Sequence, residues 1–148
     1  MAGDGDDGSV QGLHDTVATH GLRDSVSFLG FVSGDEKERV LPEAWAFALP
    51  SHQENFGVAV LEAVAAGLPV VISGEVQLRS FVEANEVGVV VDRTDPSAIA
   101  EGLETVLADD AGRRRVADQG PIAVQETFSL GHVGIQLKKM YDQMSPSS

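Results

Sequence analysis

The sequence predicts an α/β fold in which helices cover both faces of a parallel sheet. Short, continuously apolar runs alternate with helical stretches, and continuous rather than alternating apolarity is typical of strands that are buried on both faces. The chain has 148 residues, 43% hydrophobic and 22% charged, which suits one globular domain. We therefore expect a single domain over residues 1–148, with a loose tail at residues 144–148.

The first half of the chain gives clear local signals. Residues 9–20 carry apolar side chains at helical spacing, and Gly21 follows as a helix stop. The run VSFLGFV at residues 26–32 predicts a strand, and residues 35–44 predict a short helix because acidic residues lead it. Residues 46–49, closed by a proline, predict a second strand.

The centre of the chain predicts the rest of the sheet. Residues 57–66 predict a helix that Gly67 stops, and residues 70–73 predict a strand directly after it. A helix over residues 78–85 and a strand over residues 88–92 follow.

The last part predicts only helices. Asp95 followed by proline opens a helix that runs to about Ala108. Two more helices are expected, one through residues 113–120 and one over residues 129–143.

Ligands of open parallel sheets bind at the carboxyl ends of the strands. Three loops are expected at that edge: residues 31–35, 50–57 and 73–78. We expect the formal GxGxxG at residues 3–8 to be a strand-end loop rather than a dinucleotide fingerprint, because only Met1 and Ala2 precede it and two aspartates would face the pyrophosphate.

Charge and composition exclude several classes of function. Lys plus Arg is 10 and Asp plus Glu is 23, so the net charge is −13 and nucleic acid is not an expected partner. The chain has no cysteine, which excludes disulfides and zinc–thiolate sites. No apolar run reaches the ~20 residues of a membrane span, and the first residues are neither basic nor apolar, so we expect a cytoplasmic protein.

Two glutamates mark the second of the three loops. Glu54 lies in the loop before the helix at residues 57–66, whose first N–H groups form an anion site. Glu62 lies within that helix, where a buried carboxylate needs polar partners such as ribose hydroxyls. The spacing alone leaves a second interpretation open, with Glu62 on the solvent face, because Glu75 and Glu83 repeat the interval.

The surrounding motifs resemble a known family. VSFLGFV, ALPSHQENFGVAVLEAVAAGLPVVIS and VGVVVD, together with the E-x7-E spacing, are similar to the donor-binding C-terminal half of retaining glycosyltransferases of family 4 (group 1), which have the GT-B fold. Weaker similarity extends to FSLGHVGIQLKKMYDQM near the end of the chain. The resemblance implies a Rossmann-like parallel sheet flanked by helices, with the first strands of the family's domain lacking.

The resemblance also implies roles for individual residues. Glu54 would be the catalytic residue facing the reacting sugar carbon, and Glu62 would hold the ribose. Backbone N–H groups at the start of the helix would line the sugar and diphosphate, and residues 31–33 would meet the base. The substrate-binding residues implied are Glu62, Asn55, Phe56, Gly57, Val58, Phe31, Val32, Ser33 and His52.

The implied reaction moves a hexose from a nucleoside-diphosphate sugar to an acceptor hydroxyl with retention, without a metal or a cofactor. The family's Arg and Lys at the diphosphate have no counterpart here, and Arg79 is the one basic residue expected near it. The acceptor would be bound by an N-terminal domain that is missing, so we expect the isolated chain to be inactive. Alternatives are a non-catalytic nucleotide-sugar-binding remnant and a GT-B-fold sugar-nucleotide epimerase.

The missing strands also affect the sheet. In the family they lie between the strands that correspond to residues 26–32 and 46–49. Their absence predicts that the chain re-pairs these strands, dimerises through an exposed strand edge, or needs its missing half.

Overall fold

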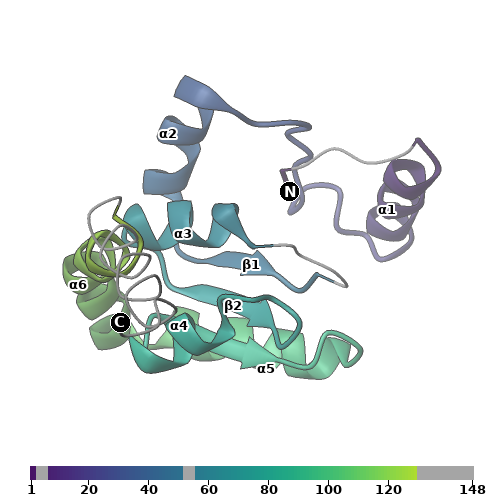
Figure 1. Ribbon diagram of the computed structural model, residues 1–148. Helices are drawn as coiled ribbons and strands as arrows, with labels where there is room; N and C mark the ends of the chain where they lie inside the picture. Colours follow the sequence, from purple (N-terminus) through teal and green to yellow (C-terminus); the bar gives the residue numbers. More distant parts are fainter. Residues whose placement is uncertain (3–6, 52–55, 130–148) are drawn as a thin grey trace, which may run out of the picture. The chain divides into compact units, whose positions relative to one another are not determined.

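The computed structural model describes residues 1–2, 7–51 and 56–129, shown in Figure 1. Its contacts divide the chain into two compact units, Met1–Val40 and Leu41–Ser148. We refer to them as the first and second units. That residues 1–148 form a single domain stays a prediction.

The first unit contains helix α1 (Asp7–Thr19) and most of helix α2 (Gly34–Glu43), close to the predicted bounds. The predicted strand over residues 26–32 is wrong. A single parallel bridge joins Ala2 to Gly30, and the N–H of Leu29 donates to the carbonyl of Met1 at 2.8 Å. A strand forms only where a neighbouring strand accepts its hydrogen bonds. None of the described residues of the first unit is buried, so its apolar side chains have no core of their own.

The second unit contains the parallel sheet that the apolar runs predict. Its strands are β1 (Phe47–Leu49), β2 (Val70–Ser73) and β3 (Gly88–Val91), all parallel and in the order β1-β2-β3. Every residue of β2 is buried, because this strand is paired on both edges and covered on both faces. The α/β fold class is therefore confirmed, with three strands rather than four in the described part of the chain.

Four helices surround this sheet: α3 (Val58–Ala65), α4 (Arg79–Ala84), α5 (Pro96–Ala108) and α6 (Asp110–Phe128). Helices α3, α4 and α6 share one core with the side chains of Val70 and Ile72. Helix α5 covers the other face, where Gly102 approaches Val71. Figure 1 shows α3 and α5 on opposite sides of the sheet.

The start of helix α5 follows the predicted capping chemistry. Asp95 accepts a hydrogen bond from the N–H of Ser97 at 2.8 Å, and Pro96 occupies the first helical position of α5. Asp109 caps α6 in the same way, accepting from the N–H of Gly112 at 2.8 Å. Helix α6 includes residues 113–120 as predicted, whereas nearly all of the helix predicted over residues 129–143 lies outside the described residues.

Helix α6 lies directly against the backbone of α3 and of the turn that follows it. A Cβ atom at Gly67 would lie 2.9 Å from the Cα of Ala117. A Cβ atom at Gly120 would lie 2.8 Å from the carbonyl oxygen of Val64. Glycine at both positions lets the two segments meet at a distance that a side chain would prevent.

The outer edge of β1 pairs with no strand among the described residues. The N–H of Phe47 donates to the carbonyl of Pro69 at 3.0 Å, so the alternation of the strand directs the N–H of Ala48 to the outer edge. Dimerisation through this edge stays a prediction, and Ala48→Pro tests it because proline removes that donor and is tolerated on edge strands. We expect sedimentation velocity to show a dimer for the wild type and a folded monomer for Ala48→Pro. A wild-type monomer, or a dimer that survives the substitution, would contradict it.

Candidate functional site

The candidate site lies at the carboxyl edge of the sheet, where β1 and β2 end. The hydroxyl of Ser73, the last residue of β2, donates to the backbone carbonyl of Ser51 at 2.7 Å. Ser73 is fully buried, and this hydrogen bond satisfies its hydroxyl. The bond holds the carboxyl end of β2 against the segment that follows β1.

Gly57 opens helix α3 at this edge. Its φ of 83° and ψ of 42° are left-handed, a conformation that glycine adopts without the strain other residues incur. A Cβ atom there would lie 3.2 Å from Cγ1 of Val76 and 3.3 Å from Cδ1 of Leu78. Gly57 is buried against these side chains, so the turn itself requires glycine at this position.

The first turn of α3 is suited to an anion. The N–H groups at the start of an α-helix lack the acceptor four residues earlier in the helix, and they carry the positive end of its dipole. In α3 the N–H of Val60 already donates to the carbonyl of Gly57 at 2.8 Å, so the donors for an anion would be the N–H groups that precede Val60. Gly57 has no side chain with which to cap them. Its neighbours Phe56 and Val58 are 42% and 59% exposed, so solvent reaches both sides of this turn. A phosphate group would find hydrogen-bond donors here.

Glu62 lies one helical turn beyond Val58, on the same face of α3. The face that carries Val60, Ala63 and Val64 is fully buried in the core, whereas Glu62 is half-buried. Side chains on a helix tilt towards its N-terminus, so we expect the carboxylate to lie towards Val58 and the carboxyl edge of the sheet. This position, at the rim of the core, is compatible with a carboxylate that accepts hydrogen bonds from a ligand.

The remaining site residues implied by the sequence stay predictions. His52, Glu54 and Asn55 lie outside the described residues. Phe31, Val32 and Ser33 belong to the first unit, where Phe31 is 72% exposed. Their proximity to α3 stays a prediction.

The basic residues near this edge have acidic partners. Arg93, directly after β3, pairs with Glu75 at 3.0 Å and so joins the loops that follow β3 and β2. Arg79, at the start of α4, pairs with Glu83 at 3.0 Å, and both side chains are about half exposed. The sequence expectation that Arg79 contacts a diphosphate stays a prediction.

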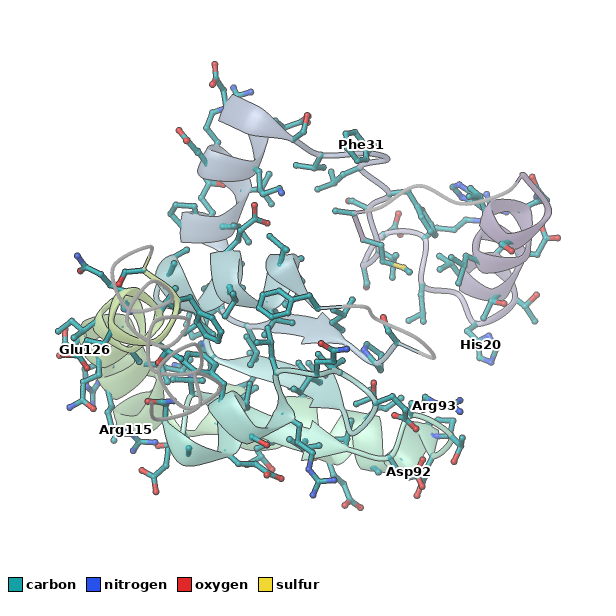
Figure 2. All side chains as sticks on the ribbon, in the orientation of Figure 1. His20, Phe31, Asp92, Arg93, Arg115 and Glu126 are labelled. Atoms are coloured by element: carbon teal, nitrogen blue, oxygen red, sulfur yellow. The ribbon has the colours of Figure 1, made fainter. Side chains whose placement is uncertain are left out.

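Asp92 lies beside Arg93 in the loop after β3 (Figure 2). Its carboxylate accepts hydrogen bonds from the hydroxyl of Thr94 at 2.7 Å and from the N–H of Thr94 at 2.8 Å. The hydroxyl first, and then the N–H, lower the pKa of Asp92 below its usual value. A lowered pKa stabilises the folded loop at neutral pH, and that contribution is lost as the pH falls through the lowered value.

Two cavities of the second unit lie elsewhere. One of about 400 Å³ is lined by Trp45, Pro69 and Arg113 among others, and one of about 340 Å³ by Gly88 and Arg115 among others. Both lie towards the amino ends of the strands. Helix starts and carboxyl strand ends bind anions in parallel sheets, so we place the candidate site at α3 and not in these cavities.

Within residues 1–2, 7–51 and 56–129, no three His, Asp or Glu side chains gather as a metal site requires. No helix in that part of the chain has the length and apolarity to cross a membrane.

Sequence reasoning missed an aromatic contact at the site. The ring of Phe56 meets the ring of Phe128, the last residue of α6, edge-on at a centroid distance of 5.9 Å. The ring of Phe128 in turn meets that of Phe81 at 5.1 Å. The three residues are far apart in the sequence, so no local pattern could indicate the contact.

Comparison with known proteins identifies the family. Residues 1–122 match the family model described as glycosyl transferases group 1. The chain belongs to this family. The resemblance to the C-terminal domain of a group 1 glycosyltransferase, inferred from the sequence motifs, is thereby confirmed, whereas retention of configuration stays a prediction. The Rossmann-like sheet of a GT-B C-terminal domain is confirmed by the solved structure described below.

Several group 1 relatives are considerably longer than this chain. It is 33% identical over 129 residues to an uncharacterized glycosyltransferase of Methanocaldococcus jannaschii, covering 87% of this chain and 33% of the relative. It is 35% identical over 131 residues to the D-inositol 3-phosphate glycosyltransferase of Salinispora tropica, covering 88% of this chain and 27% of the relative. The chain thus spans between about a quarter and a third of these relatives.

A solved structure shares the fold. The sucrose-phosphate synthase of Thermosynechococcus elongatus superposes with a TM-score of 0.80 at 28% identity, covering 97% of this chain and 37% of that protein. The similarity therefore includes nearly the whole chain, within a much larger protein.

Proposed function

We propose that this group 1 glycosyltransferase chain binds the donor in a reaction that moves a hexose from a nucleoside diphosphate to an acceptor hydroxyl with retention. One observation carries the proposal. Helix α3 begins at a left-handed glycine at the carboxyl edge of the sheet, and half-buried Glu62 lies one turn further along on the face of Val58. An anion site and a hydroxyl acceptor are thus present on one short helix.

Each part of the donor has a matching group. The first-turn N–H groups of α3 would bind the diphosphate and stabilise the negative charge that develops as it leaves. The carboxylate of Glu62 would accept hydrogen bonds from the two ribose hydroxyls. Glu54, assigned from the family resemblance, would face the reacting carbon of the sugar. This scheme needs no metal and no cofactor.

We further propose that a domain outside this chain binds the acceptor. The matched residues make up only 33% and 27% of the family members compared above, which supports an acceptor-binding domain outside this chain. The isolated chain is then expected to bind the donor without transferring the sugar. A cytoplasmic location is part of the same proposal.

Thermal unfolding with UDP-, GDP- and ADP-glucose tests donor binding. A Kd near ~1 mM at about 10 mM ligand adds about 1.4 kcal/mol of stability, which raises Tm by about 3 to 5 °C. We expect one of the three donors to give this shift in the wild type. We expect Glu62→Ala to lose most of it, measured from its own ligand-free Tm.

The matched control is Glu104→Ala, which removes an exposed glutamate from α5 on the opposite face of the sheet. It should keep the full shift. Equal shifts in Glu62→Ala and the wild type would reject the ribose assignment, and no shift with any donor would reject donor binding by this chain.

A further inference from the structure

The aromatic contact between Phe56 and Phe128 ties the start of α3 to the end of α6. Phe56 directly precedes Gly57, and its ring is 42% exposed. It meets Phe128 at an interplanar angle of 87°, the edge-to-face geometry that aromatic pairs favour. Phe128 rests on Phe81, which is only 8% exposed. A ring in the site loop is thus connected to the core through Phe128.

Helix α6, which carries the Phe128 ring, packs closely against α3 and the turn after it. Its backbone meets that of Gly67 through Ala117, and Gly120 meets the carbonyl of Val64, so the helix has little freedom to slide along α3. Phe128 is the last residue of this helix. Its position relative to α3 is therefore fixed by backbone packing as well as by its own side chain.

The backbone conformation at Phe56 affects the first hydrogen bonds of α3, because Gly57 directly follows it. The carbonyl of Gly57 accepts from the N–H of Val60 at 2.8 Å and from the N–H of Leu61 at 3.4 Å. A rotation of the backbone at Phe56 would turn Gly57 and weaken both bonds. The donor-binding N–H groups of the first turn would then lose their common direction.

We propose that Phe128 is a positioning residue for donor binding: its ring holds Phe56, and thereby the first turn of α3, in the orientation that receives the diphosphate. This inference rests on the proposed function. Phe128 touches no reacting atom and acts through Phe56 alone.

Amide hydrogen exchange tests the positioning step without a ligand. In Phe128→Leu, which keeps an apolar side chain but removes the ring, the amide of Val60 should exchange about three- to tenfold faster, because an edge-to-face pair contributes about that factor. The amide of Val82, bonded to the carbonyl of Leu78 at 2.9 Å inside α4, reports general loss of stability. The increase at Val60 should exceed that at Val82.

Two further variants separate the ring from general packing. Phe128→Tyr retains the ring and should exchange like the wild type at Val60. Val124→Ala removes a core contact one turn earlier on α6, and should speed exchange at Val60 and Val82 equally. Unchanged exchange at Val60 in Phe128→Leu, or an increase no larger than that at Val82, would overturn the inference.

Titration with UDP-, GDP- and ADP-glucose tests the consequence for binding. For the donor that binds the wild type, Phe128→Leu should raise Kd about three- to tenfold, while Phe128→Tyr and Val124→Ala should not. Unchanged Kd in Phe128→Leu would overturn the inference while leaving the proposed function intact. If no donor binds the wild type, the proposed function fails and the inference fails with it, although faster exchange at Val60 would still establish the ring contact.

Discussion

Replacing Gly88 by alanine is expected to abolish cooperative folding of the second unit. Gly88 begins β3 and is the register partner of Val70 in β2. A Cβ atom at Gly88 would lie 2.0 Å from the carbonyl oxygen of Val70 and 2.8 Å from its carbonyl carbon. Both atoms belong to the backbone of the central strand, so the overlap can be relieved only by separating β2 from β3.

The expected cost is about 4 kcal/mol or more, a large share of the ~5–15 kcal/mol that stabilises an ordinary domain. Urea unfolding followed by circular dichroism should show a strongly lowered midpoint or no transition. The control is Gly74→Ala in the same unit, where the new Cβ atom meets only the Arg79 side chain at 3.7 Å. A midpoint for Gly88→Ala close to that of Gly74→Ala would contradict the packing described here.

Gly67→Ala is expected to lower Tm by about 6 to 12 °C, corresponding to about 3 kcal/mol. Gly67 has a φ of 81°, and a left-handed alanine costs about 1–2 kcal/mol. The rest arises because the new Cβ atom would lie 2.9 Å from the Cα of Ala117, which forces α6 away from the turn that ends α3. Differential scanning calorimetry measures the change directly.

Asparagine at the same position separates the two causes. Asn tolerates a left-handed backbone better than alanine does, yet it carries the same Cβ atom. We therefore expect Gly67→Asn to remain strongly destabilised through its overlap with Ala117. Recovery of the wild-type Tm in Gly67→Asn would mean that backbone strain alone explains the alanine variant.

Local chemistry predicts much of the second unit from the sequence. Strand β2 has the bounds that the sequence predicts, because three consecutive apolar residues are typical of a strand buried on both faces and Ser73 ends it. The start of α5 is equally clear, since Asp95 and Pro96 each satisfy a separate requirement of a helix N-terminus.

Pairing could not be predicted in the same way. Residues 26–32 have the composition of a strand, but the only β partner among the described residues is the single bridge at Ala2. Whether a β-prone segment becomes a strand depends on which backbone lies beside it, and this is not a local property.

The candidate site, too, could be predicted from the sequence only in part. Sequence periodicity left Glu62 between the solvent face and the rim of the core, and the structure places it at the rim because Val60, Ala63 and Val64 take the core face. The ring contact of Phe56 with Phe128 and the close approach at Gly67 arise from tertiary packing. A sequence shows that a glycine is present, but not which backbone presses against it.

The close backbone packing of α6 against α3 and the turn after it has a consequence for conformational change. Two segments that meet backbone to backbone cannot shear past one another without a clash, so a ligand that moved α3 would carry α6 with it as one rigid block. Any hinge that closes around the proposed donor site must therefore lie outside this pair, and a truncation that removes α6 would remove the helix against which α3 packs.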